Sequence, residues 1–302
     1  MSFWLLPSMR ILTGSALFAG LGTYLYGTRV ESRRFQLDVV RLTIGQGQSS
    51  LKTETKKSES QLRILHLSDL HLCYPESHKV EFIKRVTDDD YDLVVLTGDV
   101  FEDYSGLVYA SSLLSRRPSL GAYAVLGNHD YYNYQYYHKL LGRIIKRLRH
   151  PAATRDVRPM IEALEGSGIT VLRNQATNHP ERKVHIVGID YPTIHREHLA
   201  QLTAHALPED IVLVLFHLPI NLDNISKSGA HLALGGHTHG GQICIPGLGA
   251  IITDSELPRS EASGLFCRGA TTFHISRGLG ADPRTNFRFF CPPAATVLEV
   301  TY

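Results

Sequence analysis

The chain has 302 residues, of which 43% are hydrophobic and 20% charged, an ordinary composition for a globular protein of one large or two small domains. Its net charge of +2 is too small to indicate a nucleic-acid-binding protein, and no segment indicates an obligate protein partner. The four cysteines form no Cys-x-x-Cys pair, which argues against a zinc ribbon or a disulfide framework and favours a reducing compartment.

An apolar run near the N-terminus, residues 11–28, has eighteen positions and no charge. As a helix it would be about 27 Å long against a hydrocarbon core of roughly 30 Å, so we expect residues 1–29 to form a membrane-anchor helix. A helix lying in the membrane interface and a cleaved signal peptide are the alternatives. Three arginines follow the run, namely Arg29, Arg33 and Arg34, whereas only Arg10 precedes it. Because positively charged flanks tend to stay in the cytoplasm, this favours a cytoplasmic location for the rest of the protein.

The rest of the chain predicts a layered α/β domain. Residues 35–44 alternate as a strand does and residues 45–61 are polar, so residues 30–61 are predicted as a strand and a polar linker before a main domain over 62–302. From residue 62 onward, short apolar runs typical of buried strands alternate with helical segments such as 79–87. The runs lie at 63–67, 92–96, 122–126, 184–189, 211–216, 231–234, 272–276 and 296–300.

Polar residues with metal-binding side chains follow five of these runs. They are Asp69 and His71, Asp99, Asn128, His217, and the pair His237 and His239 in a glycine-rich stretch. In open α/β sheets ligands bind at the carboxyl ends of strands, so we expect these side chains to meet at one rim. Asp and Asn are also common in ordinary turns, but the whole set together favours a site; His66, His185 and His231 are expected to be core or surface residues.

The donor types indicate a divalent ion. Aspartate, imidazole and amide donors without thiolate suit Mn²⁺ or Fe, and Zn²⁺ would also fit. Seven donors are enough for two ions if one carboxylate bridges them, and two ions roughly 3.5 to 4 Å apart can clamp the phosphoryl oxygens of an attacked ester. The set therefore predicts hydrolysis of a phosphate ester or anhydride.

In order along the chain, the motifs Asp69-x-His71, Gly98-Asp99, Gly127-Asn128-His129-Asp130, His217 and Gly236-His237-Thr238-His239 resemble those of the calcineurin-like metallophosphoesterase superfamily. The resemblance implies a four-layer α/β/β/α sandwich, here with an N-terminal apolar helix, and two divalent ions, Mn²⁺ first and Fe, Mg²⁺ or Zn²⁺ otherwise. It assigns one ion to Asp69, His71 and His239, the other to Asn128, His217 and His237, and the bridge to Asp99.

The same resemblance implies catalytic roles for the next two residues of the third motif. His129 would contact the phosphate and stabilise the transition state or protonate the leaving oxygen, and Asp130 would orient His129.

A basic amphipathic insertion is predicted over residues 131–160. A helix there places Leu141 and Ile144 on an apolar face flanked by Lys139, Arg143 and Arg147. Such a helix would either contact an anionic membrane surface or a phospholipid-like substrate at the site, or pack its apolar face on the domain.

The Gly-His-Thr-His-Gly-Gly-Gln stretch and the Ser276-Arg277-Gly278-Leu279-Gly280 segment resemble a membrane-linked branch of the superfamily. Within that branch the chain is similar to the UDP-2,3-diacylglucosamine pyrophosphohydrolases of lipid A biosynthesis. This implies a lipid-linked nucleotide substrate, the products 2,3-diacylglucosamine 1-phosphate and UMP, and a place at the bacterial inner membrane with the catalytic domain in the cytoplasm. The alternatives are a membrane-anchored phosphodiesterase or phosphatase for another lipid head group or nucleotide, and a non-catalytic scaffold; no ligand of the set is missing, which argues against the scaffold.

Overall fold

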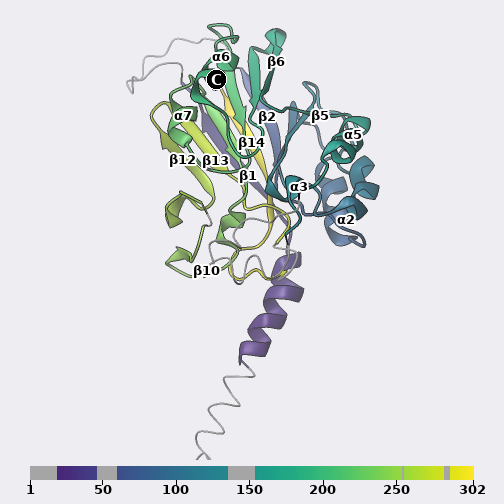
Figure 1. Cartoon of the computed structure of the whole chain (residues 1–302). Coiled ribbons are helices and arrows are strands. Elements are labelled where there is room, and N and C mark those ends of the chain that lie inside the picture. Colours follow the sequence, from purple (N-terminus) through teal and green to yellow (C-terminus); the bar gives the residue numbers. More distant parts are fainter. Residues whose placement is uncertain (1–18, 46–59, 135–153, 254, 282–285) are drawn as a thin grey trace, which may run out of the picture.

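The computed structural model describes residues 19–45, 60–134, 154–253, 255–281 and 286–302. Two six-stranded sheets form its centre (Figure 1). The first sheet has the order β1-β14-β2-β3-β4-β5, formed by Gln36–Thr43, Ala294–Thr301, Gln61–Leu67, Leu93–Thr97, Ala122–Val125 and Ile169–Val171. The second has the order β12-β13-β9-β8-β7-β6, formed by Gly264–Arg268, Thr271–Ile275, Leu232–Gly235, Ile211–Leu215, Val184–Gly188 and Gln175–His179.

Helices cover the outer face of each sheet. The first sheet is covered by α2 (His78–Val86), α5 (Arg158–Gly166) and the 3-10 helix η3 (Tyr104–Ser112), and the second by α6 (Arg196–Thr203) and α7 (Leu222–Ser226) (Figure 1). Smaller elements are α3 (Asn128–Tyr131), η5 (Pro180–Arg182), η6 (His239–Gly241), η7 (Arg259–Glu261) and the two-stranded hairpin β10 (Cys244–Ile245) and β11 (Gly249–Ala250).

Three apolar cores separate the layers. Leu65 of β2 belongs to the core between the first sheet and its helices, whereas Ile64 belongs to the core between the sheets. Neighbouring residues of a strand point to opposite faces, so β2 contributes to both. The third core joins the second sheet to Leu199 of α6 and Ile225 of α7. The succession of helices, sheet, sheet and helices agrees with the α/β/β/α sandwich that the resemblance implies.

The runs predicted as strands form strands within one or two residues of the predicted bounds, and the helix predicted at 79–87 is α2. The edge strands β5, β6 and β12 were not predicted. Their side chains are only partly buried, with alternating or mixed exposure in place of the fully apolar pattern of β3, β7 and β8. An edge strand packs against fewer neighbours, so its sequence carries a weaker apolar signal.

The strand predicted at 35–44 is β1, which lies at the edge of the first sheet. It pairs with β14 in parallel over eight residues, from Gln36 beside Ala294 to Thr43 beside Thr301. Because β14 is antiparallel to β2, the start of β1 lies at the same end of the sheet as the carboxyl end of β2. The segment that precedes β1 therefore enters the domain at the end where the predicted ligands lie.

That segment is helical over residues 19–25 and continues as the π-helix η1 (Tyr26–Val30) and the 3-10 helix η2 (Glu31–Arg33). It projects from the domain, in purple in Figure 1, and its residues 19–25 are exposed. Across the described ranges, no helix has both the length and the apolar character to cross a membrane. The predicted anchor falls largely on residues 1–18, outside the described residues.

The predicted basic insertion also falls largely outside the described residues. The structure describes Tyr131 to Tyr134 and then continues at Thr154. The five residues predicted to contact substrate or membrane are Lys139, Leu141, Arg143, Ile144 and Arg147, and they lie in the part that is not described.

Candidate active site

The predicted metal ligands lie at one end of the two sheets, in loops that leave the carboxyl ends of β2, β3, β4, β8 and β9. Their backbone is unusual: among the described residues other than glycine, eleven have positive φ, and five of these are predicted ligands. The five are Asp69, His71, Asp99, His237 and His239. A residue in this left-handed region costs about 1–3 kcal/mol and persists where the surroundings require it, so the concentration here marks a functional constraint.

The first ligand group consists of Asp69, His71 and His239, whose ligand atoms lie within 4.8 Å of one another. The Nε2 atoms of His71 and His239 are 3.3 Å apart, and His239 Nε2 is 3.7 Å from Asp69 Oδ1. Ser68 Oγ donates a hydrogen bond of 2.6 Å to Asp69 Oδ2 and so fixes the carboxylate. These are the three residues that the family resemblance assigned to one ion.

The second ligand group consists of Asp99, His217 and His237, again with ligand atoms within 4.8 Å of one another. The side-chain oxygen of Asn128 completes it, at 3.0 Å from His217 Nε2 and 2.9 Å from His237 Nδ1. His217 is held by its other ring nitrogen, which donates to the carbonyl of Thr97 at 2.8 Å.

Asp99 lies between the two groups. Its Oδ2 atom is 3.3 Å from His217 Nε2 in the second group and 3.7 Å from His71 Nε2 in the first. One carboxylate oxygen therefore faces donors of both groups, which is the placement expected of a bridge between two ions. The seven predicted ligands form candidate groups for a dinuclear metal centre.

The charges of these groups fit divalent cations. Burial lowers the pKa of His217, but the carboxylates of Asp99 and Asp69 outweigh burial and raise this pKa to about 9. Likewise, the hydrogen bond to Glu102 and the charges of Asp99 and Asp69 overcome burial and raise the pKa of His71. Buried carboxylates need positive charge nearby, and a divalent ion with neutral imidazole ligands supplies it in place of protons.

Two glycines allow the loops to approach closely. A Cβ atom at Gly236 would lie 2.0 Å from Ser68 Oγ and 2.6 Å from Asp69 Oδ2. At Gly127 it would lie 2.2 Å from Asp99 Oδ1. Any larger residue would push a ligand aside, so glycine is required at both positions.

Glu102 is a site residue that the sequence analysis missed. Its Oε2 atom is 2.9 Å from His71 Nδ1 and 2.8 Å from His129 Nδ1, so one carboxylate orients a metal ligand and the predicted catalytic histidine. Burial opposes the charged form, but the hydrogen bonds to His129 and His71 outweigh it and hold the pKa of Glu102 well below its ordinary value. The only sequence signal was an acidic residue three positions after Asp99.

Asp130 has a different role from the one predicted. We expected it to orient His129, but its Oδ2 accepts hydrogen bonds from the backbone N–H of Gly127 at 2.8 Å and of Asp99 at 3.0 Å. Burial and the neighbouring Asp99 raise the pKa of Asp130 to about 7. Asp130 therefore holds two ligand loops together, and Glu102 orients the His129 ring because it is the carboxylate within reach of Nδ1.

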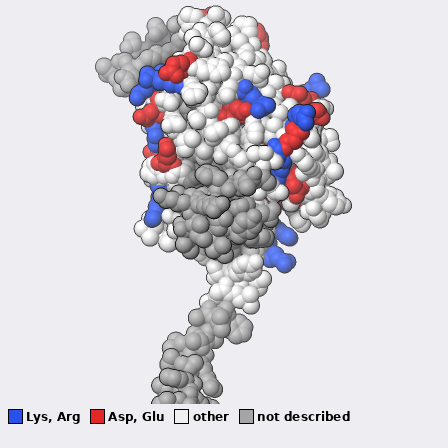
Figure 2. Space-filling model, in the orientation of Figure 1, with Lys and Arg blue, Asp and Glu red and all other residues white. Residues whose placement is uncertain are grey.

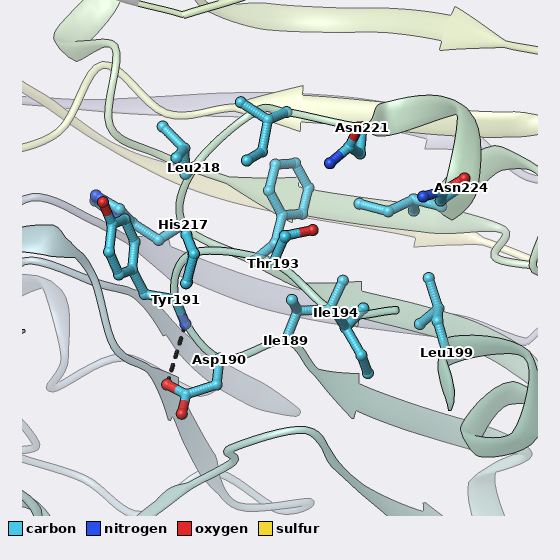
Figure 3. Close-up of a pocket in the computed structure, with 14 residues that line it drawn as sticks. Ile189, Asp190, Tyr191, Thr193, Ile194, Leu199, His217, Leu218, Asn221 and Asn224 are labelled. Atoms are coloured by element: carbon cyan, nitrogen blue, oxygen red, sulfur yellow. Dashed lines mark hydrogen bonds between the residues drawn. The ribbon is translucent and has the colours of Figure 1, made fainter. Parts of the chain in front are cut away.

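An aromatic wall and a pocket lie beside the ligands. The ring of Tyr134 is 4.6 Å from that of His129, and Tyr132 meets Tyr191 edge to face at 6.1 Å. The pocket lies next to His217, with Tyr191 at that end and Asn221 on the far rim (Figure 3). Ile189, Ile194, Leu199 and Phe216 form its apolar part, and Asn224 stands with Asn221 on the polar side.

This arrangement of ligands agrees with a comparison of the whole chain with known families. Residues 62–241 match the calcineurin-like phosphoesterase family. The chain belongs to this family. As a metallophosphoesterase it is a metal-dependent phosphoester hydrolase.

Several curated metallophosphoesterases are similar along most of their length. The uncharacterized metallophosphoesterase YkoQ of Bacillus subtilis is 28% identical over 80% of this chain and 85% of its own. The phosphodiesterase YaeI of Escherichia coli is 29% identical over 81% of this chain and 84% of its own. The UDP-2,3-diacylglucosamine pyrophosphatase LpxG of Chlamydia muridarum is 25% identical over 80% and 84%. The family is thus shown, while among these three relatives of similar identity only LpxG has a name that gives a substrate.

Proposed function

We propose that this metallophosphoesterase is a pyrophosphate hydrolase that cleaves UDP-2,3-diacylglucosamine to 2,3-diacylglucosamine 1-phosphate and UMP. The observation that carries the chemistry is the pair of ligand groups that share Asp99, with His129 held beside them by Glu102. Two divalent ions bound there would neutralise charge on the attacked phosphoryl group and lower the pKa of water. Mn²⁺ is the ion we propose, because the donors are imidazole nitrogens and carboxylate and amide oxygens.

The protein residues supply the leaving-group chemistry. Water adds to one phosphorus while the bond from that phosphorus to the bridging oxygen breaks, and the released phosphate oxygen needs a proton. Because the Nδ1 atom of His129 is engaged by Glu102, its Nε2 atom is the one available to deliver that proton. Burial lowers the pKa of His129 overall, and the carboxylates of Asp99 and Glu102 oppose that shift and so favour the protonated imidazole.

The surroundings support a substrate that is larger than a bare phosphate. Beside His129 stands the wall of Tyr132, Tyr134 and Tyr191, and beside His217 lies the pocket with an apolar part and two asparagines. A flat base attached to the phosphate would find aromatic rings in this wall, whereas the apolar side chains of the pocket belong to the core beneath the site. The similarity to LpxG of Chlamydia muridarum supports the lipid-linked nucleotide in particular.

We further propose that the protein acts at the bacterial inner membrane, with its N-terminal segment as the anchor and the catalytic domain in the cytoplasm. The uncharged run at residues 11–28 and the arginines that follow it support this placement.

Purified full-length protein should be assayed with UDP-2,3-diacylglucosamine and with bis(4-nitrophenyl) phosphate, each with Mn²⁺, Mg²⁺ or Zn²⁺. We expect release of UMP with Mn²⁺ giving the highest rate. A second candidate is a phosphodiesterase for another lipid head group or a nucleotide, and the similarity to the phosphodiesterase YaeI supports the diesterase chemistry. Turnover of the simple diester without any release of UMP would establish that alternative and end the lipid A assignment.

A further inference from the structure

An exposed apolar surface lies at the end of the molecule that carries the metal ligands. Three segments form it: the projecting helix, the hairpin β10–β11 with its flanks, and the loop before β14. We call it the apolar end surface. Its members are Leu21, Tyr24, Leu25, Val30, Ile243, Ile245, Leu248, Ile251, Ile252 and Phe290, with exposed fractions from 37% to 75%.

The three segments are joined to one another by backbone hydrogen bonds and ring contacts. Cys244 N donates to the carbonyl of Phe289 at 2.9 Å, and Phe289 N donates to that of Gln242 at 2.9 Å. Tyr26 meets Phe289 edge to face at 6.2 Å, and Tyr24 stacks on Phe287 at 6.4 Å. The helix, the loop and the hairpin that carry the exposed apolar side chains are therefore held together at this end of the domain.

This surface shares its end of the domain with the active site. The hairpin begins three residues after η6, which contains the ligand His239. The helix enters at the start of β1, and the pairing of β1 with β14 and of β14 with β2 places that start at the same end of the sheet as the carboxyl end of β2. In Figure 1 the projecting helix and β10 both lie at the lower end of the domain, opposite the C-terminus.

The charges distinguish a lipid surface from a protein partner. The twelve residues 242–253 contain no charged side chain, and the run 11–28 that leads into the helix contains none either. Exposed Arg29 and Arg33 follow that run directly. On the domain body, by contrast, basic and acidic side chains are interspersed over the visible face (Figure 2). Uncharged apolar tips with flanking arginines and several Tyr and Phe rings are the pattern of a bilayer interface.

We propose that the apolar end surface docks on a lipid bilayer, with the hairpin β10–β11 inserted among the lipids beside the helix. Two separate segments then contact the bilayer, which fixes the tilt of the domain and turns the ligand end toward the head groups. A phosphoester in the membrane would reach the site without leaving the bilayer. The docking is independent of which phosphoester the enzyme cleaves.

The test places a fluorescent reporter on the hairpin of the full-length protein. Trp4 is the single tryptophan of the chain, so Trp4→Phe removes the background and Leu248→Trp adds a reporter at the most exposed position of the surface. Vesicles of phosphatidylethanolamine and phosphatidylglycerol are added, with and without lipids that carry a quencher in the acyl chain. We expect a blue shift of the emission and quenching from within the bilayer.

A matched control is Leu207→Trp in the same background. Leu207 is also an exposed leucine, at 45%, but it precedes β8 and so lies at the opposite end of the sheet from His217. We expect no shift and no quenching there. Vesicle-bound protein in which the reporter at position 248 stays in water would overturn the proposal. A blue shift without vesicles that grows with protein concentration would also overturn it, because it would assign the surface to a second copy of the chain.

A pair of charge substitutions tests the same surface without a reporter. In Ile245→Asp with Leu248→Asp, we expect vesicle partitioning to fall about tenfold or more, since two exposed apolar side chains no longer enter the lipid. Hydrolysis of bis(4-nitrophenyl) phosphate should be unchanged, because both side chains point to solvent. Unchanged partitioning together with a reporter in water would leave the helix segment as the sole contact and refute the hairpin's role.

Discussion

Two sets of buried histidines in this protein have opposite electrostatic environments. His66 and His274 meet between the sheets, with their Nδ1 atoms 3.0 Å apart, and His66 Nε2 pairs with Thr97 Oγ1 at 2.8 Å. Burial lowers the pKa of both, that of His274 to about 4. His71 and His217 are buried to a similar degree, yet neighbouring carboxylates raise the pKa of each.

The difference shows that burial alone does not distinguish a core histidine from a metal ligand. A neutral pair with a hydroxyl partner is a satisfied core group, whereas an imidazole facing carboxylates lies where positive charge is needed. Within the described residues, the candidate metal groups include neither His66 nor His274. Substitutions at the metal ligands and at the core pair can test this difference.

Loss of the bridging carboxylate should have the largest effect. In Asp99→Ala, both ligand groups lose the oxygen that they share, and we expect kcat to fall by about 10³-fold or more. Activity on bis(4-nitrophenyl) phosphate and bound metal, measured by elemental analysis, are the readouts. Asp223→Ala, at an exposed position on α7, is the control and should keep both. A near-normal rate in Asp99→Ala would refute the two-ion arrangement.

The buried, neutral pair of His66 and His274 should make the free energy of unfolding depend on pH. The folded protein holds the pKa of His274 at about 4, below the ordinary value of 6.5, so between these values the unfolded chain binds more protons. Stability is therefore full above about pH 6.5 and is lost as pH falls toward 4, by up to about 3 kcal/mol.

Urea unfolding of wild type and His274→Phe between pH 7.5 and pH 4.5 measures this contribution. The phenylalanine variant should lose less of its free energy of unfolding on acidification, whatever its stability at pH 7.5. Parallel curves for the two proteins would show that the pair does not remain neutral.

The carboxylate behind His129 should have a smaller effect on rate. Glu102→Gln keeps the shape of the side chain but removes the charge, and we expect kcat to fall about 10- to 100-fold. The charge of Glu102 raises the pKa of His129. Without that charge His129 loses its proton at a lower pH, so the alkaline limb of the pH–rate profile should shift to lower pH. A profile that keeps its position would show that Glu102 has only a structural role. Combined with His129→Gln, the substitution should add little, because the two groups act as a unit.

Much of the site could be predicted because it depends on local order along the chain. Asp69, Asp99 and His217 each follow an apolar run directly, and parallel strands bring such residues to one rim. Glu102 could not be found in this way, because its role depends on hydrogen bonds to His71 and His129 that only the folded chain brings within reach. Acidic residues are also common in loops such as the one that contains it. The role of Asp130 was misjudged for the same reason: its partners are backbone groups that only the folded loops bring close.

For the fold, too, features that depend on local sequence could be predicted and features that depend on long-range pairing could not. Strands buried on both faces were evident as apolar runs, whereas the pairing of β1 with β14 joins residues 258 positions apart, as Gln36 and Ala294 are, and no local pattern indicates it. The apolar hairpin at 244–250 was likewise not predicted as an element, because glycine and proline interrupt its short strands.

The position of β14 between β1 and β2 bears on the order in which the protein can be completed during synthesis. Among the described strands, β1 has no neighbour in its sheet until Ala294–Thr301 has emerged from the ribosome. The metal loops after β2, β3 and β4 can form earlier, but the projecting segment joined to β1 gains its fixed position only after β14 has emerged. A ribosome stalled before β14 has emerged would therefore hold a domain whose N-terminal segment is still unattached.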